Sequence, residues 1–497
     1  MGARAPTVAF RTLGCRLNQA ETDLMAEDLL ALGFQVVGEG EDPDVVVVNT
    51  CTVTHEATRG SRHEARAAAQ RSPEALVVVA GCYAVAEPEE ARAIEGVGMV
   101  AGNDEKERIA ELIATRLRLG QKGRMGTAGE PGGAPGTMRG LMQIGPRPAW
   151  APALPRPDEA PPRRGFPGAD RTRVNLKVQT GCDEHCTFCI IPTTRGPLRS
   201  LPLGDLLERA RRKVAEGTRE LVLTGVHLGK YGWDVGRPDE ALVRLLEGLL
   251  EIDGLARIRL SSILCRHLTP AVVGLFAAER RLCRFFHVPL QAGADRVLER
   301  MHRPYRVGEY LDAAERVKRD VPGAGIATDA IVGFPGETAE EFEQTLAVVE
   351  RVGFLKVHAF RYSPRAGTPS ASWPDQVPEQ EKKRRSRELI AAANRTREAY
   401  HRRQVGLCRE VLVESRSAGG ELNGTTDDFV RVSFEPPPDA SGAEELVGNL
   451  ALVRVDQART SGVRGTFERA VDWGEADPRR TSWPAVARIS GTGNGAT

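Results

Sequence analysis

The sequence predicts a multidomain α/β protein with an N-terminal parallel-sheet domain, a central partial (β/α) barrel and a small C-terminal β-barrel. Two stretches alternate short apolar runs with helical patterns, which is typical of βαβ units and parallel strands. A third stretch alternates apolar and polar residues between loops, which is typical of a small barrel. The chain has 497 residues, enough for about three domains, and its ordinary composition allows sizeable cores.

We place the N-terminal domain at residues 1–117. Its expected strands are the apolar runs TVAFRTLG, DVVVVNT and ALVVVAG, and each is followed by a stretch of helical periodicity. Residues 118–167 turn to Pro, Gly and Arg, as in GEPGGAPGTMRG. Such a segment cannot form a packed core, so we expect a linker there.

We place the barrel at residues 168–400. The expected strands are VNLKVQT, ELVLTG, RIRLSS, FFHVPL, GIATDAIVGFPG and LKVHAFRYS. Six strand-helix units predict an open, partial barrel, because a full one has eight. A basic helix closes this domain, with a net charge of +7 between Lys382 and Arg403.

Residues 401–471 form the expected C-terminal β-barrel, with REVLVES, FVRVSF and LVGNLALVRVDQA as its strands. Residues 472–497 are a short polar tail. The whole chain has a net charge of +1, so any nucleic-acid surface must be local, such as the basic helix. The N-terminus has no apolar signal region and no run of 18 apolar residues occurs, so we expect a cytoplasmic protein without a membrane span.

Three of the nine cysteines, Cys182, Cys186 and Cys189, have the spacing C-x3-C-x2-C. Three thiolates are too few to close a tetrahedral zinc site, although His185 could be a fourth ligand. The short spacing places the cysteines in one loop, without the two paired knuckles of a zinc ribbon. Three cysteines can hold a [4Fe–4S] cluster and leave one iron open. The motif therefore indicates an iron–sulfur cluster in preference to zinc.

Cys15, Cys51 and Cys82 each stand just after an apolar strand, in TLGC, VNTC and VAGC. The carboxyl ends of parallel strands share one edge of the sheet, so we expect these thiols to converge. A lone buried cysteine usually acts as a small hydrophobe, but the repeated placement predicts a second three-cysteine cluster. Cys265, Cys283 and Cys408 share no spacing and are expected to be packing residues.

A C-x3-C-x2-C motif directly after the first strand of a partial barrel resembles the radical S-adenosylmethionine (SAM) family. The resemblance implies that the open iron chelates the amino and carboxylate groups of SAM, and that reduction releases methionine and a 5′-deoxyadenosyl radical. It implies that Phe188 lies beside the adenine and that the backbone at Thr224 and Gly225 approaches the SAM amino group. Plain loop packing at Phe188 and a simple strand-to-helix turn at Thr224 are the structural alternatives.

One departure from the family pattern follows the third barrel strand. Relatives usually carry Glu and Pro after RLSS and one further residue, whereas this chain has Leu264 and Cys265 there. A carboxylate contact from this loop is therefore in doubt. No catalytic side chain beyond the cluster ligands is assigned.

The chain, apart from the linker and tail, resembles the radical SAM methylthiotransferases, which join an N-terminal cluster domain, a radical SAM barrel and an OB-like TRAM barrel. The segments TLGCRLNQAETD, NTCTVTHEATRGSRHEAR and VAGCYA resemble the MtaB type. This implies methylthio transfer to C2 of N6-threonylcarbamoyladenosine at position 37 of tRNA, with two [4Fe–4S] clusters and two SAM molecules per turnover. The cofactors supply the reactivity and the protein supplies position and water exclusion.

The implied partners are the tRNA anticodon stem-loop and an electron donor of the flavodoxin or ferredoxin type, and we expect a monomer. Phe429 and Phe434 of the C-terminal barrel could stack on bases or pack in the core. Three alternatives stay open. The substrate could be isopentenyladenosine-37 of tRNA or an aspartate of ribosomal protein S12, or the protein could bind RNA and carry structural clusters.

Overall fold

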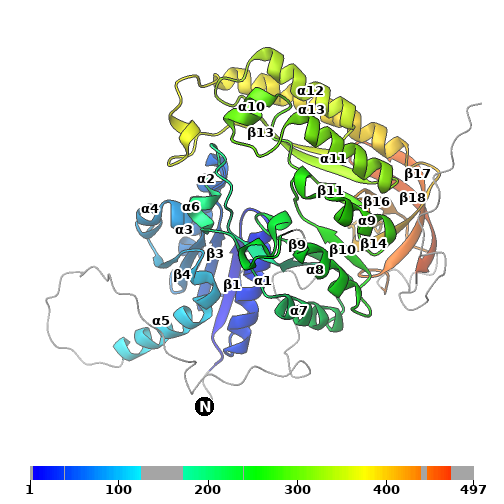
Figure 1. The fold of residues 1–497 in the computed structure, drawn as a ribbon. Helices are drawn as coiled ribbons and strands as arrows, with labels where there is room; N and C mark the ends of the chain where they lie inside the picture. Colours follow the sequence, from blue (N-terminus) through cyan, green and yellow to red (C-terminus); the bar gives the residue numbers. More distant parts are fainter. Residues whose placement is uncertain (1–3, 39, 125–171, 239, 438–444, 472–497) are drawn as a thin grey trace, which may run out of the picture. The chain divides into compact units, whose positions relative to one another are not determined.

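The computed structural model describes residues 4–38, 40–124, 172–238, 240–437 and 445–471 (Figure 1). The chain divides into two compact units, Met1–Ala169 and Asp170–Thr497. Most of the expected linker at 118–167 and the tail at 472–497 lie outside the described residues. None of the described helices is both long and apolar enough to cross a bilayer.

The first unit is built on a parallel five-stranded sheet with the order β2-β1-β3-β4-β5. β3 and β4 are nearly continuous runs of buried valine because helices cover both faces of the sheet. The strands are β1 (Thr7–Thr12), β2 (Gln35–Val36), β3 (Val45–Thr50), β4 (Leu76–Gly81) and β5 (Val97–Ala101). The helices are α1 (Arg16–Ala31), α2 (His55–Arg71), α3 (Cys82–Ala86), α4 (Pro88–Arg92), η1 (Glu105–Arg108) and α5 (Ile109–Arg124). The last helix runs past Leu117, where we expected the linker to begin.

The second unit begins with six parallel strands that form an open barrel, as the sequence predicts. They are β6 (Arg173–Lys177), β9 (Glu220–Thr224), β10 (Arg257–Leu260), β11 (Phe285–His287), β12 (Gly325–Val332) and β13 (Lys356–Arg361). Two three-stranded parallel sheets, β10-β9-β6 and β11-β12-β13, are linked by isolated bridges such as Ser262 to His287. In the part of the chain that the structure describes, β6 and β13 do not pair, so the barrel is not closed.

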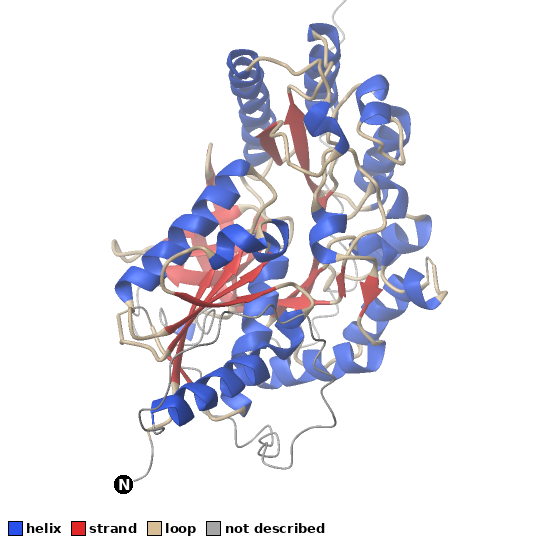
Figure 2. Cartoon of the chain, turned by 90° about the vertical axis from the view of Figure 1, so that its left-hand side faces the viewer, coloured by secondary structure: helices blue, strands red, loops and turns tan. Residues whose placement is uncertain are grey.

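Helices follow the strands of the barrel and cover one face of them (Figure 2). They are α6 (Ile191–Arg195), α7 (Leu203–Ala215), α8 (Ala241–Leu250), α9 (Pro270–Ala278), α10 (Asp295–Arg300), α11 (Val307–Asp320), α12 (Ala339–Val352) and α13 (Glu379–Arg402). Short 3-10 turns are η2 (Leu228–Lys230), η3 (Trp233–Val235), η4 (Cys265–His267) and η5 (Pro369–Ser372), and β7 (Gln179–Thr180) pairs with β8 (Arg199–Ser200).

The C-terminal segment is a closed five-stranded barrel with the order β14-β15-β16-β18-β17. Its strands are β14 (Cys408–Arg416), β15 (Leu422–Thr426), β16 (Arg431–Phe434), β17 (Leu450–Arg459) and β18 (Gly462–Val471). Inward-facing residues such as Val411, Val413 and Phe434 are fully buried. The small barrel that the alternating pattern predicts is therefore confirmed.

This small barrel covers the amino ends of the large-barrel strands. Phe285 at the start of β11, Ala327 near the start of β12 and Leu355 just before β13 share one hydrophobic cluster with the core of the small barrel. Gly325 lies so close that a Cβ atom there would be 2.5 Å from the carbonyl oxygen of Asp428. The carboxyl ends of the same strands stay available for a functional site.

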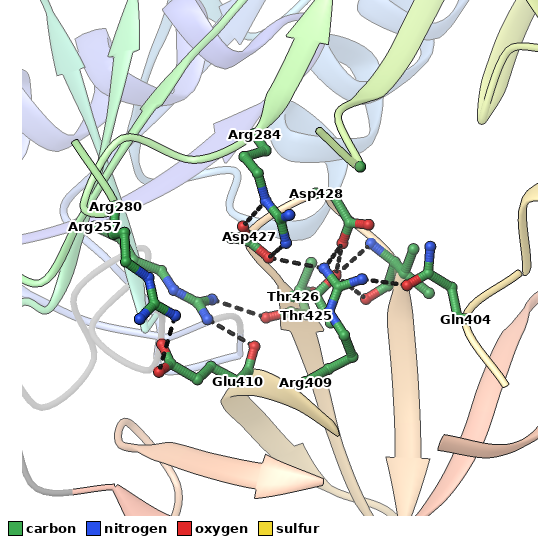
Figure 3. A network of polar contacts seen from close by, with 12 residues as sticks. Arg257, Arg280, Arg284, Gln404, Arg409, Glu410, Thr425, Thr426, Asp427 and Asp428 are labelled. Carbon is green, nitrogen blue, oxygen red and sulfur yellow. Dashed lines mark hydrogen bonds and ion pairs between the residues drawn. The ribbon is translucent and has the colours of Figure 1, made fainter. Parts of the chain in front are cut away.

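Arginines from the amino ends of β10 and β11 fasten the two barrels together (Figure 3). Arg257 donates to the carbonyl oxygens of Thr425 and Glu410 at 3.0 and 2.7 Å, and Arg284 donates to Asp427 at 2.7 Å. Arg259, fully buried, pairs with Glu220 at 2.7 Å and also donates to the carbonyl of Asp427. These bonds satisfy buried guanidinium groups that would otherwise be costly.

Candidate metal centres

The three cysteines of the C-x3-C-x2-C motif lie in one loop after β7, at the carboxyl end of the first barrel strand. Gly181 precedes them with a φ of 71°, and a Cβ atom at this position would lie 1.8 Å from the carbonyl oxygen of Pro197. The amide of Cys182 donates to the carbonyl of Gly196 at 3.1 Å, and that of Cys189 to the carbonyl of Cys186 at 3.0 Å. The loop therefore has a fixed backbone that only glycine at 181 permits.

Burial disfavours free thiolates in this loop. It raises the pKa of Cys182 to about 11 and that of Cys189 to about 12. Thiols with such values stay neutral near pH 7 unless a metal deprotonates them. The loop therefore does not suit a single activated cysteine nucleophile, but it does suit cysteines that bind a metal.

The spacing of the ligand atoms separates a single ion from a multi-iron cluster. Among the described residues, one group of three or more His, Cys, Asp or Glu has ligand atoms within 4.8 Å of one another, and it contains no cysteine. Both cysteine triplets are thus set wider than the donors of one tetrahedral ion. His185 is exposed and does not complete a compact four-ligand set with the loop. Neither donor set matches a single zinc ion, and three thiols are the number of protein ligands of a cluster with one open iron.

Two residues of the motif loop are anchored by the segment after β9. Glu184 accepts a charged contact from Lys230 at 2.8 Å and lies 3.3 Å from Nε2 of His227. The hydrogen bond from His227, followed by the Lys230 ammonium, holds the pKa of Glu184 well below its ordinary range. Lys230 also contacts Asp183 at 2.9 Å. The loop is therefore tied to η2 through ionised groups.

Arg303 supplies a positive charge beside the thiols. Its Nη1 donates to Sγ of Cys186 at 3.1 Å, while Nε donates to the hydroxyl of Tyr305 at 3.2 Å. Hydrogen bonds to cluster sulfurs and nearby charge are the means by which proteins set a cluster's reduction potential. Arg303 follows the third cysteine by more than a hundred residues, so motif spacing gives no signal for it.

The segment at Thr224 and Gly225 lies against the cysteine loop. A Cβ atom at Gly225 would be 2.8 Å from Oε1 of Gln179. The same oxygen accepts from the amide of His227 at 2.8 Å, while Nε2 of Gln179 donates to the carbonyl of Gly181 at 2.6 Å. Gln179, which sequence reasoning missed, thus links the loop to the carboxyl end of β9.

Phe188 and the three cysteines outside the two triplets were expected to pack or to border the cofactor. Phe188 packs edge-on against Phe334, with ring centroids 6.4 Å apart, and is partly buried against the barrel core. Cys265 is buried in η4, and burial raises the pKa of its thiol to about 11. Cys283 is also buried as expected, but Cys408 at the start of β14 is exposed and does not pack.

The second cysteine set follows three neighbouring strands of the first unit. In the sheet register Thr12 of β1 pairs with Asn49 of β3, and Thr50 pairs with Gly81 of β4. The chain therefore leaves all three strands at one edge, where Cys15 caps α1, Cys51 follows β3 and Cys82 begins α3. This is the edge that the sequence predicts.

Two glycines bring these cysteines close. A Cβ atom at Gly14 would lie 2.8 Å from Sγ of Cys51, and one at Gly81 would lie 2.7 Å from the carbonyl oxygen of Thr50. Both have positive φ values, 94° and 103°. Cys51 and Cys82 are buried and Cys15 is exposed, so one side of the site faces outward.

A buried polar network holds this edge. Asn18 donates to the carbonyls of Leu13 and Thr50 at 2.7 and 2.9 Å, and Asn49 donates to the carbonyl of Asn18 at 2.8 Å. Ser61 exchanges two hydrogen bonds with the backbone of Cys51. Asn18 follows Cys15 in TLGCRLNQ, so a polar residue one turn into the helix was a usable signal.

The expected RNA-facing groups are mostly engaged within the protein. On α13, Arg385 pairs with Glu337, Arg395 with Glu350 and Arg402 with Glu398. In the small barrel, Phe434 is fully buried and packs parallel to Phe467, with ring centroids 6.3 Å apart. Phe429 is held between the barrels, 4.7 Å from the ring of Phe285 and 4.9 Å from the guanidinium of Arg259. Both phenylalanines pack, and neither presents a free ring to a base.

Comparisons with known proteins match a different family to each of the two units. Residues 7–102 match the family described as Uncharacterized protein family UPF0004, and residues 176–349 match the Radical SAM superfamily. The chain resembles the threonylcarbamoyladenosine tRNA methylthiotransferase MtaB of Bacillus subtilis, with 34% identity over 94% of this chain and 97% of that protein. The MtaB of Thermotoga maritima is 35% identical over 92% of this chain and 96% of its own length.

Related proteins with another named substrate are almost as similar. The tRNA-2-methylthio-N(6)-dimethylallyladenosine synthase of Carboxydothermus hydrogenoformans is 32% identical over 92% of this chain and 98% of that protein. Among solved structures, the radical SAM methyltransferase TsrM from Kitasatospora setae has a TM-score of 0.52 and 18% identity. It covers 74% of this chain and 75% of its own, and supports the fold alone. The protein is an enzyme that uses SAM and an iron–sulfur cluster, and the chain belongs to the radical SAM methylthiotransferase family.

Proposed function

We propose that this enzyme transfers a methylthio group to C2 of N6-threonylcarbamoyladenosine at position 37 of tRNA, with two [4Fe–4S] clusters. Cys182, Cys186 and Cys189 would hold one cluster, and Cys15, Cys51 and Cys82 the other. The observation that carries the proposal is the presence of a cysteine triplet in both units. In the first unit three cysteines follow three parallel strands, in the second they share one loop at the carboxyl end of the first barrel strand, and neither triplet has the spacing of a single ion.

When bound, one cluster with SAM supplies a radical able to attack an unactivated C–H bond, and the other supplies the sulfur atom. The chain's own residues position these groups. Gly181 allows the loop to close, and Gln179 packs directly against Gly225 and holds the loop to the carboxyl end of β9. The C-terminal barrel covers the amino ends of the strands and excludes water from that side.

The choice of threonylcarbamoyladenosine is supported by the residues after Cys51. Thr52 and Thr58 share a hydrogen bond of 2.8 Å, and the side chain of Thr54 caps α2 by accepting from the amide of Ala57 at 3.1 Å. These residues lead from the cysteine directly into α2, and the segment NTCTVTHEATRGSRHEAR resembles the MtaB type. The relatives named MtaB are 34 and 35% identical, against 32% for the Carboxydothermus relative, so overall identity adds little.

The test is an anaerobic assay of reconstituted protein with SAM, dithionite and tRNA that carries the threonylcarbamoyl modification. We expect 5′-deoxyadenosine and a 2-methylthio nucleoside, both detected by mass spectrometry. Parallel assays offer tRNA with isopentenyladenosine, or the ribosomal protein S12, as the substrate. If one of these is modified while the threonylcarbamoyladenosine tRNA is unchanged, it replaces the proposed substrate. If no 5′-deoxyadenosine forms, the proposed radical chemistry is contradicted. Assays with flavodoxin or ferredoxin in place of dithionite test the expected electron donor.

Single cysteine variants separate the two sites. Cys186→Ala should abolish 5′-deoxyadenosine formation, because its thiol is a ligand for the SAM-binding cluster. Cys51→Ala should retain 5′-deoxyadenosine formation and lose the methylthio product. Cys408→Ala is the matched control, because this thiol is exposed and remote in sequence from both sets. Methylthio product from Cys51→Ala at the wild-type level would contradict the two-site assignment.

A further inference from the structure

A third group of metal-ligating side chains lies on the barrel strands and contains no cysteine. His287 is the last residue of β11, Asp329 lies within β12 and His358 lies within β13. In the parallel register His287 pairs with Ala327, and Asp329 pairs directly with His358. Since residues two apart on a strand share a face, the three side chains lie on one face of this sheet.

That face is the concave one. On the other face, Thr328 donates to the carbonyl of Val288 and lies 3.4 Å from the hydroxyl of Tyr310 on α11, so helices cover it. Ala327, on the same face as Asp329, packs instead in the cluster shared with the small barrel. The three side chains therefore line the inside of the open barrel, above its closed amino end.

Their ligand atoms converge. One nitrogen of each histidine and one carboxylate oxygen all lie within 4.8 Å of one another. Nε2 of His287 is 3.0 Å from Oδ1 of Asp329, yet it is buried and has no aligned hydrogen-bond partner. The imidazole rings of His287 and His358 stack at 5.4 Å with an angle of 18° between their planes.

This geometry differs from a simple His–Asp hydrogen bond. In such a pair the ring N–H points at the carboxylate, whereas here the close contact is misaligned. Two nitrogen atoms and one oxygen atom that all lie within 4.8 Å of one another suit a cation between them. The side chains of His287 and Asp329 are 21% and 24% exposed, so an ion could reach them from the barrel interior.

We propose that His287, Asp329 and His358 bind a divalent transition-metal ion of the zinc class. Two imidazoles and one carboxylate form a donor set that such ions accept, and three protein ligands leave positions open. The open positions face the interior of the barrel, where an oxygen anion such as a carboxylate would complete the coordination. The site requires neither cysteine triplet, so it stands independently of the proposed substrate.

The test uses the reconstituted holoenzyme and zinc alone. After equilibration with zinc sulfate and removal of free metal, zinc and iron per chain are measured by mass spectrometry. We expect one zinc that is lost in His287→Gln, Asp329→Asn and His358→Gln, with the iron content unchanged. His63→Gln is the matched control, because His63 is an exposed histidine on α2.

X-ray absorption at the zinc edge of the wild-type protein gives a readout that needs no variant. Nitrogen and oxygen neighbours at about 2.0–2.1 Å with imidazole scattering support the site, whereas sulfur at about 2.3 Å would assign the zinc to cysteines. Three results would overturn the proposal. They are a shell of sulfur neighbours around the zinc, a wild-type protein that binds no more zinc than His358→Gln does, and zinc binding that persists in all three variants.

Discussion

At the scale of single residues, Gly181 shows how one missing side chain permits the loop that carries Cys182, Cys186 and Cys189. Its φ of 71° and the approach of the Pro197 carbonyl leave no room for a Cβ atom. Gly196, in the same hairpin, has a nearly identical φ of 69° but has no atom within 4 Å of the position of a Cβ. A substitution at Gly196 therefore tests backbone strain alone, whereas one at Gly181 adds a steric collision.

We expect Gly181→Ala to displace the cysteine loop and lose the cluster at Cys182, Cys186 and Cys189. Gly196→Ala should cost only the backbone strain of a conformation that glycine alone normally adopts (φ 69°, ψ −166°), about 1–3 kcal/mol, and keep the cluster. The measurements are iron per chain and 5′-deoxyadenosine formed from SAM. Equal iron content in the two variants would show that the collision at Gly181 is not what shapes the loop.

At the scale of elements, the sequence predicts the strands that are strongly apolar and misses those that are not. The valine runs of β3 and β4 and all six barrel strands follow from composition and periodicity. β2 has only two residues, and β18 reads GVRGTFERAV with much of its length exposed, so neither carries an apolar signal. β15 reads LNGTT and was missed for the same reason, whereas β5 reads VGMVA, which is apolar but only five residues long and interrupted by Gly98.

The candidate sites divide in the same way. The edge that gathers Cys15, Cys51 and Cys82 is predictable, because parallel strands end together and each cysteine follows a strand. The partners Lys230 and Arg303 and the group around Asp329 are not predictable. They meet residues that are distant in sequence, and only the strand register decides which side chains face one another.

The packing of η4 on η2 has a pH-dependent consequence. His267 is buried against Gly229 and its ring packs edge-on against His227 and Trp233. Burial, followed by the neighbouring cations, lowers the pKa of His267 to about 3. The neutral ring thus stabilises the fold above pH 6.5, and this contribution is lost as the pH falls from 6.5 towards 3.

We expect the free energy of unfolding to fall by up to about 1.4 kcal/mol from this group for each pH unit below 6.5. In His267→Gln that contribution disappears, so the difference between pH 7.5 and pH 5.5 becomes smaller. Urea titrations followed by circular dichroism at the two pH values measure it, with His63→Gln as the control. An unchanged pH difference in His267→Gln would contradict the assignment.

At the scale of the second unit, the two barrels behave as one structure because buried charges cross between them. Asp427 accepts from Arg284 at 2.7 Å and from Arg409 at 2.9 Å (Figure 3). Burial alone would raise the pKa of Asp427, but these two guanidinium groups lower it well below its ordinary value. Tyr400 of α13 adds a bond to the neighbouring Asp428 at 2.8 Å.

We expect Asp427→Asn to lower the free energy of unfolding of this unit by about 3–5 kcal/mol, because it leaves arginine charges buried without a counter-charge. Asp456→Asn is the matched control, since Asp456 pairs with Arg454 on the exposed surface of the same barrel, where a pair is worth about 0–1 kcal/mol. Urea unfolding of both variants checks this. Equal losses would mean that the charges between the barrels do not hold them together.

The cover over the amino ends of the barrel strands also bears on kinetics. It makes the large barrel a blind-ended cup, in which Phe285 and Ala327 form part of the floor. SAM must enter, and methionine and deoxyadenosine must leave, without using that end. The routes that remain are the carboxyl rim and the open side between β6 and β13. A domain at the opposite end of the strands from the cysteine loop thus restricts the paths by which small molecules reach and leave the barrel interior.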